Sequence, residues 1–221
     1  IYASILGGDE NEIIESSSFS SILGGQFNDI YISKYSFIAG GSYNKIKHGT
    51  AAYTGNHRAV ENANVILNGY QNTITGSSIY SVIFNGYQNT LTEGQYTAIL
   101  GLQNETHDAD HSLVLGSQNK TLKADYGGIN SGYANTISSS NYGGILAGGD
   151  NVLKNGEYSI IAGGQDNHIE STGANNGILG GIDNYIGSSL SSAFVIGSNI
   201  SASVSNTTFV ENLRPTTNIY I

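Results

Sequence analysis

The chain has 221 residues, of which 30 are glycine, one is proline, and none is cysteine, methionine or tryptophan. The absence of cysteine excludes a disulfide framework and a thiolate metal site. The formal net charge of −9 argues against nucleic acid or an anionic membrane surface as a partner. No apolar run approaches the length needed to cross a membrane, so we expect no membrane insertion.

A nine-residue sequence motif recurs along the chain: apolar, apolar, Gly, Gly, x, x, Asn, x, apolar. Segments 22–30 and 161–169 are two full copies, and successive copies begin 14 to 17 residues apart. Such a period is typical of repeat proteins, in which each copy is one supersecondary unit that buries its apolar side against its neighbours.

The asparagine of the motif defines the register of the repeat. It stands at Asn11, Asn28, Asn44, Asn72, Asn89, Asn104, Asn119, Asn135, Asn151, Asn167 and Asn184, and in a slipped copy at Asn199. Arg58 fills the position between Asn44 and Asn72, which brings the number of positions to thirteen. We predict a structural ladder in which each side-chain amide bonds to corner backbone groups and to the asparagine one coil away.

Glycine and apolar residues form fixed columns around this asparagine. A glycine stands three residues before it, as expected at a corner that needs positive φ or a close approach to the next coil. The positions six residues before and two residues after are mostly apolar, and we predict that both columns face the coil interior. The first column includes Ala98 and Leu113, while Thr106 and Thr121 interrupt the second.

A third column, five residues before the asparagine, is also mostly apolar. Because neighbouring strand residues point to opposite faces, we expect this column to point away from the interior. We select as a trimer seam Leu6, Leu23, Leu67, Phe84, Ile99, Val114, Leu146, Leu179 and Phe194. An apolar stripe exposed along a rod implies a partner, and three identical rods packed around an axis would satisfy it, as would two.

These columns predict an all-β fold, a short-coil parallel β-solenoid (β-roll) of about thirteen rungs of 14–17 residues. At about 4.8 Å per rung the rod would be ~60 Å long. The register stops near residue 205, so we expect a solenoid domain at 1–205 and an extended connector to a following fibre segment at 206–221, which holds the only proline.

The repeat resembles a known family. Residues 36–46, Ser-Phe-Ile-Ala-Gly-Gly-Ser-Tyr-Asn-Lys-Ile, are similar to head repeats of trimeric autotransporter adhesins, and similar repeats occur in phage and large-virus fibres. Segments 196–200 and 208–213 resemble the stretch that follows such repeats in viral fibre proteins. The resemblance covers essentially the whole chain and implies a left-handed β-roll associated as a homotrimer. It identifies a scaffold rather than a ligand, because adhesin heads share no common binding site.

The two residues between glycine and asparagine are expected at an outer corner of each coil. Aromatic rings stack on apolar sugar faces and amides bond to hydroxyls, so the candidate ligand-binding residues are Tyr43, Tyr70, Gln71, Tyr87 and Gln88. The alternative explanation is that polar residues and tyrosine are simply tolerated at half-exposed turns.

The copy around Arg58 departs from the motif, and we add His57 and Arg58 as candidates for binding an anionic ligand. Replacing one asparagine of the ladder loses the stacking interactions with its neighbours, and a binding function at that position would explain the replacement. Drift in a tolerant repeat is the simpler explanation.

Residues 106–111 contain the densest cluster of potential metal ligands. On a continuous strand His107 and His111 would share one face and Asp108 and Asp110 the other, so no face presents all four. Three copies could converge only if this segment approached the trimer axis, and we assign no metal. The acidic residues stand singly, without the carboxylate pair of a glycosidase. We expect no catalysis and no cofactor.

The predicted function is that of a structural and attachment segment of a homotrimeric viral or phage fibre on the virion surface. Its partners would be two further copies of itself and a host cell-surface glycan or protein receptor. The alternatives are a bacterial surface adhesin head, a spacer rod without a ligand, and an ice-binding solenoid. An ice-binding solenoid would need a long ladder of Thr-x-Thr pairs, but the pairs at 73–75 and 90–92 stack over only two rungs.

Overall fold

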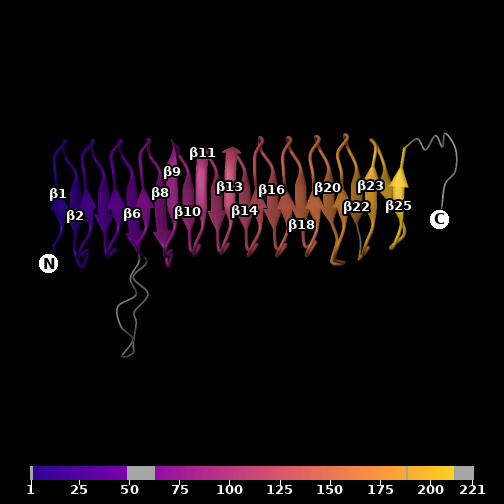
Figure 1. Ribbon diagram of the computed structural model, residues 1–221, viewed down its shortest axis with the longest axis horizontal. Coiled ribbons are helices and arrows are strands. Elements are labelled where there is room, and N and C mark those ends of the chain that lie inside the picture. Colours follow the sequence, from indigo (N-terminus) through magenta and orange to yellow (C-terminus); the bar gives the residue numbers. More distant parts are fainter. Residues whose placement is uncertain (1, 49–62, 188, 212–221) are drawn as a thin grey trace, which may run out of the picture.

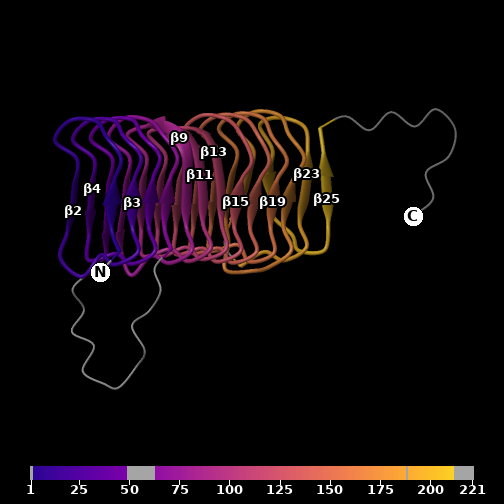
Figure 2. The same cartoon turned by 60° about the vertical axis from the view of Figure 1, so that its left-hand side comes forward.

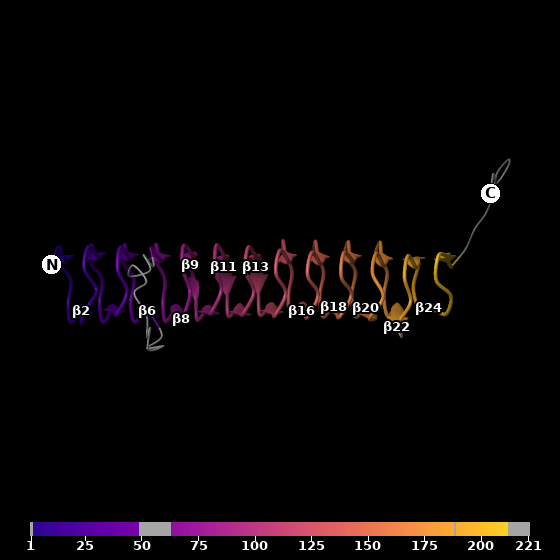
Figure 3. The same ribbon diagram turned by 90° about the horizontal axis from the view of Figure 1, so that it is seen from below.

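The computed structural model describes residues 2–48, 63–187 and 189–211. They form an all-β parallel solenoid of about 12 turns, and none of them lies in a helix. The coils stack side by side along one long axis, so that the chain rises steadily from its first strand to its last (Figures 1 and 3). The oblique view shows the coils as closed, flattened loops (Figure 2).

Each coil contributes one strand to each of two parallel sheets. The odd-strand sheet consists of β1 (Ser4–Ile5), β3 (Ser21–Ile22), β5 (Phe37–Ile38), β7 (Val65–Ile66), β9 (Val82–Tyr87), β11 (Ala98–Leu102), β13 (Leu113–Ser117), β15 (Gly128–Ile129), β17 (Gly144–Ile145), β19 (Ile160–Ile161), β21 (Gly177–Ile178), β23 (Phe194–Ile196) and β25 (Thr208–Val210). The even-strand sheet consists of β2 (Glu12–Ile14), β4 (Asp29–Tyr31), β6 (Lys45–His48), β8 (Thr73–Gly76), β10 (Thr90–Thr92), β12 (Glu105–His107), β14 (Lys120–Leu122), β16 (Thr136–Ser138), β18 (Val152–Lys154), β20 (His168–Glu170), β22 (Tyr185–Gly187) and β24 (Ser201–Ala202).

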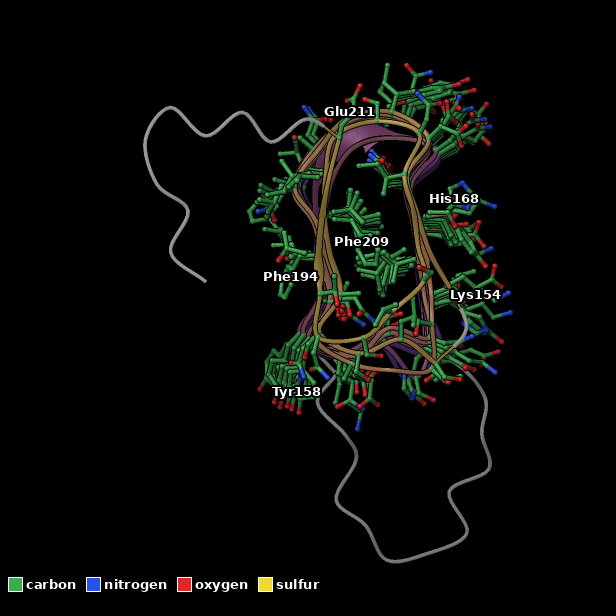
Figure 4. All side chains as sticks on the ribbon, turned by 90° about the vertical axis from the view of Figure 1, so that its right-hand side faces the viewer. Lys154, Tyr158, His168, Phe194, Phe209 and Glu211 are labelled. Carbon is green, nitrogen blue, oxygen red and sulfur yellow. The ribbon has the colours of Figure 1, made fainter. Side chains whose placement is uncertain are left out.

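The core is a single apolar layer between the two sheets. Most residues of the two predicted inward columns are fully buried, for example Ile22 and Ile30 in one coil and Ile161 and Ile169 in another. Seen along the rod axis, the sheets face each other across these side chains (Figure 4). The inward columns predicted from the sequence are therefore confirmed for most coils. Burial of one large aliphatic side chain contributes about 1.5–3 kcal/mol, and each coil repeats that contribution.

Two coils bury a different residue of the odd-strand sheet from the one predicted. Ile99 and Val114, which we assigned to the outer seam, are fully buried. Ala98 is half-buried and Leu113 is 40% exposed. The assignment of Ile99 and Val114 to a seam is therefore wrong.

The cause is a shorter link between the core residue and the corner. Two residues separate Ile83 from Gly86, but only Leu100 separates Ile99 from Gly101, and the pairing of β9 with β11 shifts register there. Strand pairing sets both the core residue and the corner glycine opposite their counterparts in the adjacent coil. A link shortened by one residue therefore moves the inward position from six to five residues before the asparagine.

No rung lies between the coils of Asn44 and Asn72. β6 pairs directly with β8, and the Asn72 backbone N–H donates a hydrogen bond of 3.1 Å to Asn44 Oδ1. The thirteenth rung predicted around Arg58 is therefore wrong, because neighbouring coils pair without it. The candidates His57 and Arg58 lie outside the described residues.

The odd-strand sheet continues beyond the domain boundary predicted at residue 205. β25 pairs with β23, with Phe209 opposite Val195, and Phe209 packs against the end of the core (Figure 4). The alternation of side chains along a strand is sufficient to turn Phe209 inward, although the glycine–asparagine motif does not continue into this segment. The described part of the predicted connector thus begins as a strand of the solenoid.

Two threonines place hydroxyl groups inside the apolar core. Thr106 and Thr121 are adjacent across β12 and β14, both are fully buried, and neither Oγ1 has a hydrogen-bond partner among the described residues. A buried hydroxyl without a partner costs about 1–3 kcal/mol.

We therefore expect Thr106→Val, which keeps the side-chain shape, to raise the free energy of unfolding by about 1 kcal/mol. Denaturant unfolding measures this change. Thr136→Val on the partly exposed outer face of the even-strand sheet serves as the control, with an expected change near zero. A destabilised Thr106→Val variant would show that the hydroxyl does have a partner.

Candidate functional site

The Gly-x-x-Asn segments form one corner of every coil, and their asparagines form a continuous ladder. Asn135 shows the geometry: its Nδ2 donates to Gly148 O at 2.9 Å and to Asn119 Oδ1 at 3.2 Å. Its Oδ1 accepts from Asn151 N at 3.1 Å and from Asn151 Nδ2 at 3.0 Å. Similar bonds link the coils from Asn11 to Asn184, and the ladder side chains from Asn28 onward are buried. The buried asparagine ladder inside this corner is therefore a structural element rather than a ligand site.

The residue immediately before each asparagine lies outside this ladder, on the solvent side of the corner. In four consecutive coils it is a glutamine with φ between 54° and 56°, namely Gln71, Gln88, Gln103 and Gln118. Their side-chain amides bond to one another at 2.9, 3.2 and 3.1 Å. The candidates Gln71 and Gln88 are thus two members of a longer, exposed glutamine ladder.

The structure brings the described ligand-binding candidates together at this corner, but it limits how their rings can act. The ring of Tyr70 stacks on that of Tyr87 at 5.5 Å and 10°, and Tyr43 stacks on Phe27 at 4.8 Å and 15°. Because stacked rings cover each other's faces, the tyrosine side chains expose only their ring edges and hydroxyl groups to solvent. The corner is therefore suited to hydrogen bonding of a ligand more than to stacking on sugar faces.

A longer aromatic ladder lies at the opposite end of the coil, where Figure 4 labels Tyr158. Its continuous part, called the aromatic ladder below, consists of Tyr80, Tyr96, His111, Tyr126, Tyr142 and Tyr158. Successive ring centroids are 4.6–5.3 Å apart, with interplanar angles of 3° to 20°. Every member has φ between 51° and 57°, and all are exposed.

Our sequence reasoning missed this ladder. Its members stand nine residues before the asparagine in most coils and eight before it in the two shortest ones. Only the columns close to the Gly-x-x-Asn corner were considered, so a column at that distance was overlooked. Counting back eight or nine residues from every asparagine would have revealed it.

The outer face of the odd-strand sheet carries no charge among the described residues. The first outward column, which precedes the core residue, consists of Ser4, Ser21, Phe37, Val65, Val82, Ala98, Leu113, Gly128, Gly144, Ile160, Gly177, Phe194 and Thr208. The second outward column, which follows it, consists of Leu6, Leu23, Ala39, Leu67, Phe84, Leu100, Leu115, Asn130, Leu146, Ala162, Leu179, Ile196 and Val210. The chain as a whole has 8 basic and 17 acidic residues, so this neutrality is not a matter of composition.

Most of the predicted seam lies on this face. Leu6, Leu23, Leu67, Phe84, Leu146 and Leu179 all fall in the second outward column and are exposed. Phe194 is also exposed, but it belongs to the first column, because Val195 is the residue that pairs opposite the core residue Ile178.

The even-strand sheet presents the opposite chemistry. Its outer face carries the ion pairs Lys120–Glu105 at 3.0 Å, Lys154–Glu170 and Lys45–Asp29, and Figure 4 shows Lys154 and His168 projecting from that side. The hydrogen bond and charge of Lys154 lower the pKa of the Glu170 carboxyl. Such exposed pairs contribute little stability, and this face is well solvated.

The hypothetical metal cluster at residues 106–111 is dispersed by the fold. β12 ends at His107, and Asp108 has φ of 49°, which ends the alternation that we assumed. His107 stays on the even-strand sheet, whereas His111 stacks between Tyr96 and Tyr126 in the aromatic ladder. Within the described ranges, no three His, Cys, Asp or Glu side chains converge as metal ligands.

His48 is buried at the end of β6, and its Nδ1 has no partner among the described residues. Burial lowers the pKa of its imidazole from the ordinary 6.5. The unfolded chain therefore takes up a proton at a higher pH than the folded protein does, and the folded state loses stability as pH falls from about 7 through this lowered pKa.

We expect His48→Gln to reduce the pH dependence of stability in that window while leaving the slope above pH 7.5 unchanged. Urea unfolding at several pH values measures the effect. An identical pH profile in the variant would contradict the assignment to His48.

The fold and its surfaces define the class of protein: a parallel β-solenoid repeat protein with one charge-free outer face and stacked aromatic residues at two corners. No protein-family model matches the chain, and no curated protein matches it. A crystal structure described as that of an acetyltransferase from Desulfovibrio desulfuricans G20 aligns with 92% of this chain and 65% of that chain, at 7% identity and a TM-score of 0.16. A similarity at this level supports no inference about fold or activity. No helix that could span a membrane occurs in the described part of the chain.

Proposed function

We propose that this chain is a structural and attachment segment of a homotrimeric fibre, with the outer face of the odd-strand sheet toward the trimer axis. The proposal includes the left-handed coil and the virion-surface location that the family resemblance implies. A bacterial surface adhesin head is the second candidate, because the same repeat suits both. The observation that carries the proposal is the charge-free apolar face.

Electrostatics favours a second copy of the chain as the occupant of that face. Two copies that each carry a net charge of −9 repel each other where their charged surfaces meet. The outer face of the odd-strand sheet is the side on which this repulsion is smallest and apolar exposure is largest. Packing it against identical copies removes water from leucine and phenylalanine side chains along the rod, at about 25 cal/mol for each Å² buried.

Attachment is assigned to the glycine–asparagine corner, which such packing leaves in solvent. The hydroxyls of Tyr43, Tyr70 and Tyr87, together with the amides of Gln71 and Gln88, repeat from coil to coil. A periodic row of hydroxyl and amide groups suits a host cell-surface glycan or an extended protein segment. The ligand is then read by hydrogen bonds along several rungs rather than at one pocket.

Mass measurement in solution tests the assembly. We expect a species of three times 23.2 kDa for this chain, and a monomer for Leu146→Glu, which places a carboxylate on the association face. The control Thr136→Glu alters the solvated face of the even-strand sheet and should remain a trimer. A wild-type monomer would overturn the proposed assembly.

Binding to a glycan array and to candidate host cells tests attachment. The double variant Tyr70→Ala, Tyr87→Ala should lose binding while keeping the trimer mass. A trimer that binds neither glycan nor cell would support a spacer rod instead. Ice binding is tested by thermal hysteresis; its structural basis is limited to the two threonine rungs, where Thr75 Oγ1 and Thr92 Oγ1 are 3.2 Å apart.

A further inference from the structure

A gap interrupts the first outward column of the odd-strand sheet. Most described members of that column bear side chains, but Gly128 and Gly144 pair directly with each other and bear none. Leu113 lies one rung before the gap and Ile160 one rung after it. Tyr126 and Tyr142 of the aromatic ladder stack on each other and stand two residues before Gly128 and Gly144 in the same coils. We call this gap the glycine socket.

The fold does not require glycine at this place. A Cβ at Gly144 would meet no atom within 4 Å, and at Gly128 the first contact would be Leu113 O at an ordinary 3.4 Å. Neither residue has a positive φ. Glycine inside a strand is destabilising by roughly 0.5–1 kcal/mol relative to alanine, and it often marks a place where another chain approaches closely.

The surface around the socket suits a second copy of this chain. The two outward columns alone form a strip about 10 Å wide and ~60 Å long, or roughly 600 Å², whereas a standard interface takes about 800 Å² from each partner. The exposed edges of the aromatic ladder enlarge this surface, and in a trimer each copy divides it between its two neighbours, so that three smaller contacts form together. Apart from His111, the ladder and the two columns contain no acidic or basic residue.

Three-fold symmetry then requires two different patches on each copy, because cyclic contacts other than two-fold ones are heterologous. The ladder and the first outward column form one edge of the face, and the second outward column forms the other. Parallel copies at equal height bring the same coils together, so the residues opposite the socket are Asn130 and Leu146 of the second outward column. Leu146 is the apolar one of the two and is 42% exposed.

We propose that the glycine socket receives Leu146 of the neighbouring copy, so that the aromatic ladder and Leu146 form the two halves of a heterologous subunit contact. The inference rests on the proposed homotrimer. It adds to that proposal the residues that set the contact and the role of the aromatic ladder, and it predicts that filling the socket separates the subunits without unfolding them.

The test compares Gly144→Leu with Gly149→Leu in the same coil. A Cβ at Gly149 would meet only Tyr133 O, at 3.8 Å, and this position lies within the glycine–asparagine corner, outside the two outward columns. We expect Gly149→Leu to keep the trimer mass, and Gly144→Leu to weaken association at least tenfold in sedimentation equilibrium while its far-UV circular dichroism stays unchanged. Trimers of Gly144→Leu as stable as wild type would overturn the socket.

Two further measurements keep the outcomes distinct. The double variant Gly144→Leu, Leu146→Ala exchanges the filled and empty positions, and we expect it to recover association; failure to recover counts against the pairing. Because the chain has no cysteine, Gly144→Cys and Leu146→Cys chains can also be mixed, and the mixture should form disulfide-linked dimers faster than either variant alone. Equal rates would overturn the heterologous contact, whereas a wild-type monomer would overturn the proposed trimer itself.

Discussion

Gly148→Ala is expected to prevent the coils from stacking at the glycine–asparagine corner. Gly148 has φ of 105°, which an alanine adopts only under strain. Its Cβ would also lie 2.6 Å from Asn151 Nδ2 and in still closer contact with Gly164 O of the next coil. Those atoms belong to the ladder that joins the coils, so neither can move away without breaking hydrogen bonds.

We expect this substitution to lower the free energy of unfolding by about 4 kcal/mol or more, since it combines backbone strain with a clash against a fixed backbone oxygen. Denaturant unfolding of the purified variant measures the loss, and protein recovered only as aggregate would agree with it. Gly149→Ala in the same coil is the control. Its Cβ would meet only Tyr133 O, at 3.8 Å, and Gly149 has no positive φ, so its free energy of unfolding should be unchanged or slightly higher. Equal stability of the two variants would contradict the role assigned to the corner glycine.

Asn89→Ala is expected to be the second large effect. Asn89 Nδ2 donates to Gly101 O at 2.7 Å and to Asn72 Oδ1 at 3.0 Å, and its Oδ1 accepts from Asn104 N at 3.0 Å. Alanine leaves the buried N–H of Asn104 without a partner, at a cost of about 1–3 kcal/mol, and removes one hydrogen bond each from the Gly101 carbonyl and from Asn72 Oδ1, at about 1 kcal/mol each. We therefore expect a loss of about 4 kcal/mol in the free energy of unfolding.

The matched control is Asn85→Ala, four residues earlier in the same coil. Asn85 is exposed, and its replacement should change the free energy of unfolding by less than about 0.5 kcal/mol. Urea unfolding of both variants decides the matter. A small effect of Asn89→Ala would mean that water replaces the lost amide, and that the ladder is not the main connection between coils.

Much of the fold could be predicted because every coil uses the same residue types at the same structural positions. Asparagines such as Asn135 and glycines such as Gly148 recur at nearly constant spacing. Each ladder asparagine bonds to the asparagine of the next coil, so the same residue type is needed in successive coils. The inward columns were readable for the same reason, since Ile22 and Ile38 occupy equivalent places. The charge-free face could be anticipated in part from the column of Leu23 and Leu67.

The errors arose where spacing along the chain did not match spacing between strands. Ile99 was assigned outward because we assumed a constant offset from the asparagine, and one residue lost before Gly101 reversed its direction. Arg58 was counted as a rung because it fell at a suitable interval, yet Asn44 bonds directly to Asn72. A regular interval indicates a repeat, but only pairing shows which copies join the stack.

The candidate site was the least predictable part. Tyr70 and Tyr87 could be placed at an outer corner from their position beside the glycine, but that their rings cover one another depends on the separation of coils. His111 was grouped with His107 because they are close in sequence. The turn at Asp108 instead sends His111 to the aromatic ladder, at the far end of the coil.

The sequence by itself determined that the chain is a solenoid with an apolar interior, an asparagine ladder and an apolar column left outside. These follow from residue types repeated at one period, which is local information. The tertiary structure decided which coils are neighbours, which residues of the shorter coils turn inward, and that the tyrosines beside Gly128 and Gly144 form one aromatic edge of a charge-free face. Those features depend on hydrogen bonding between strands of different coils, and the pairing of strands, not their order along the chain, determines which side chains lie side by side.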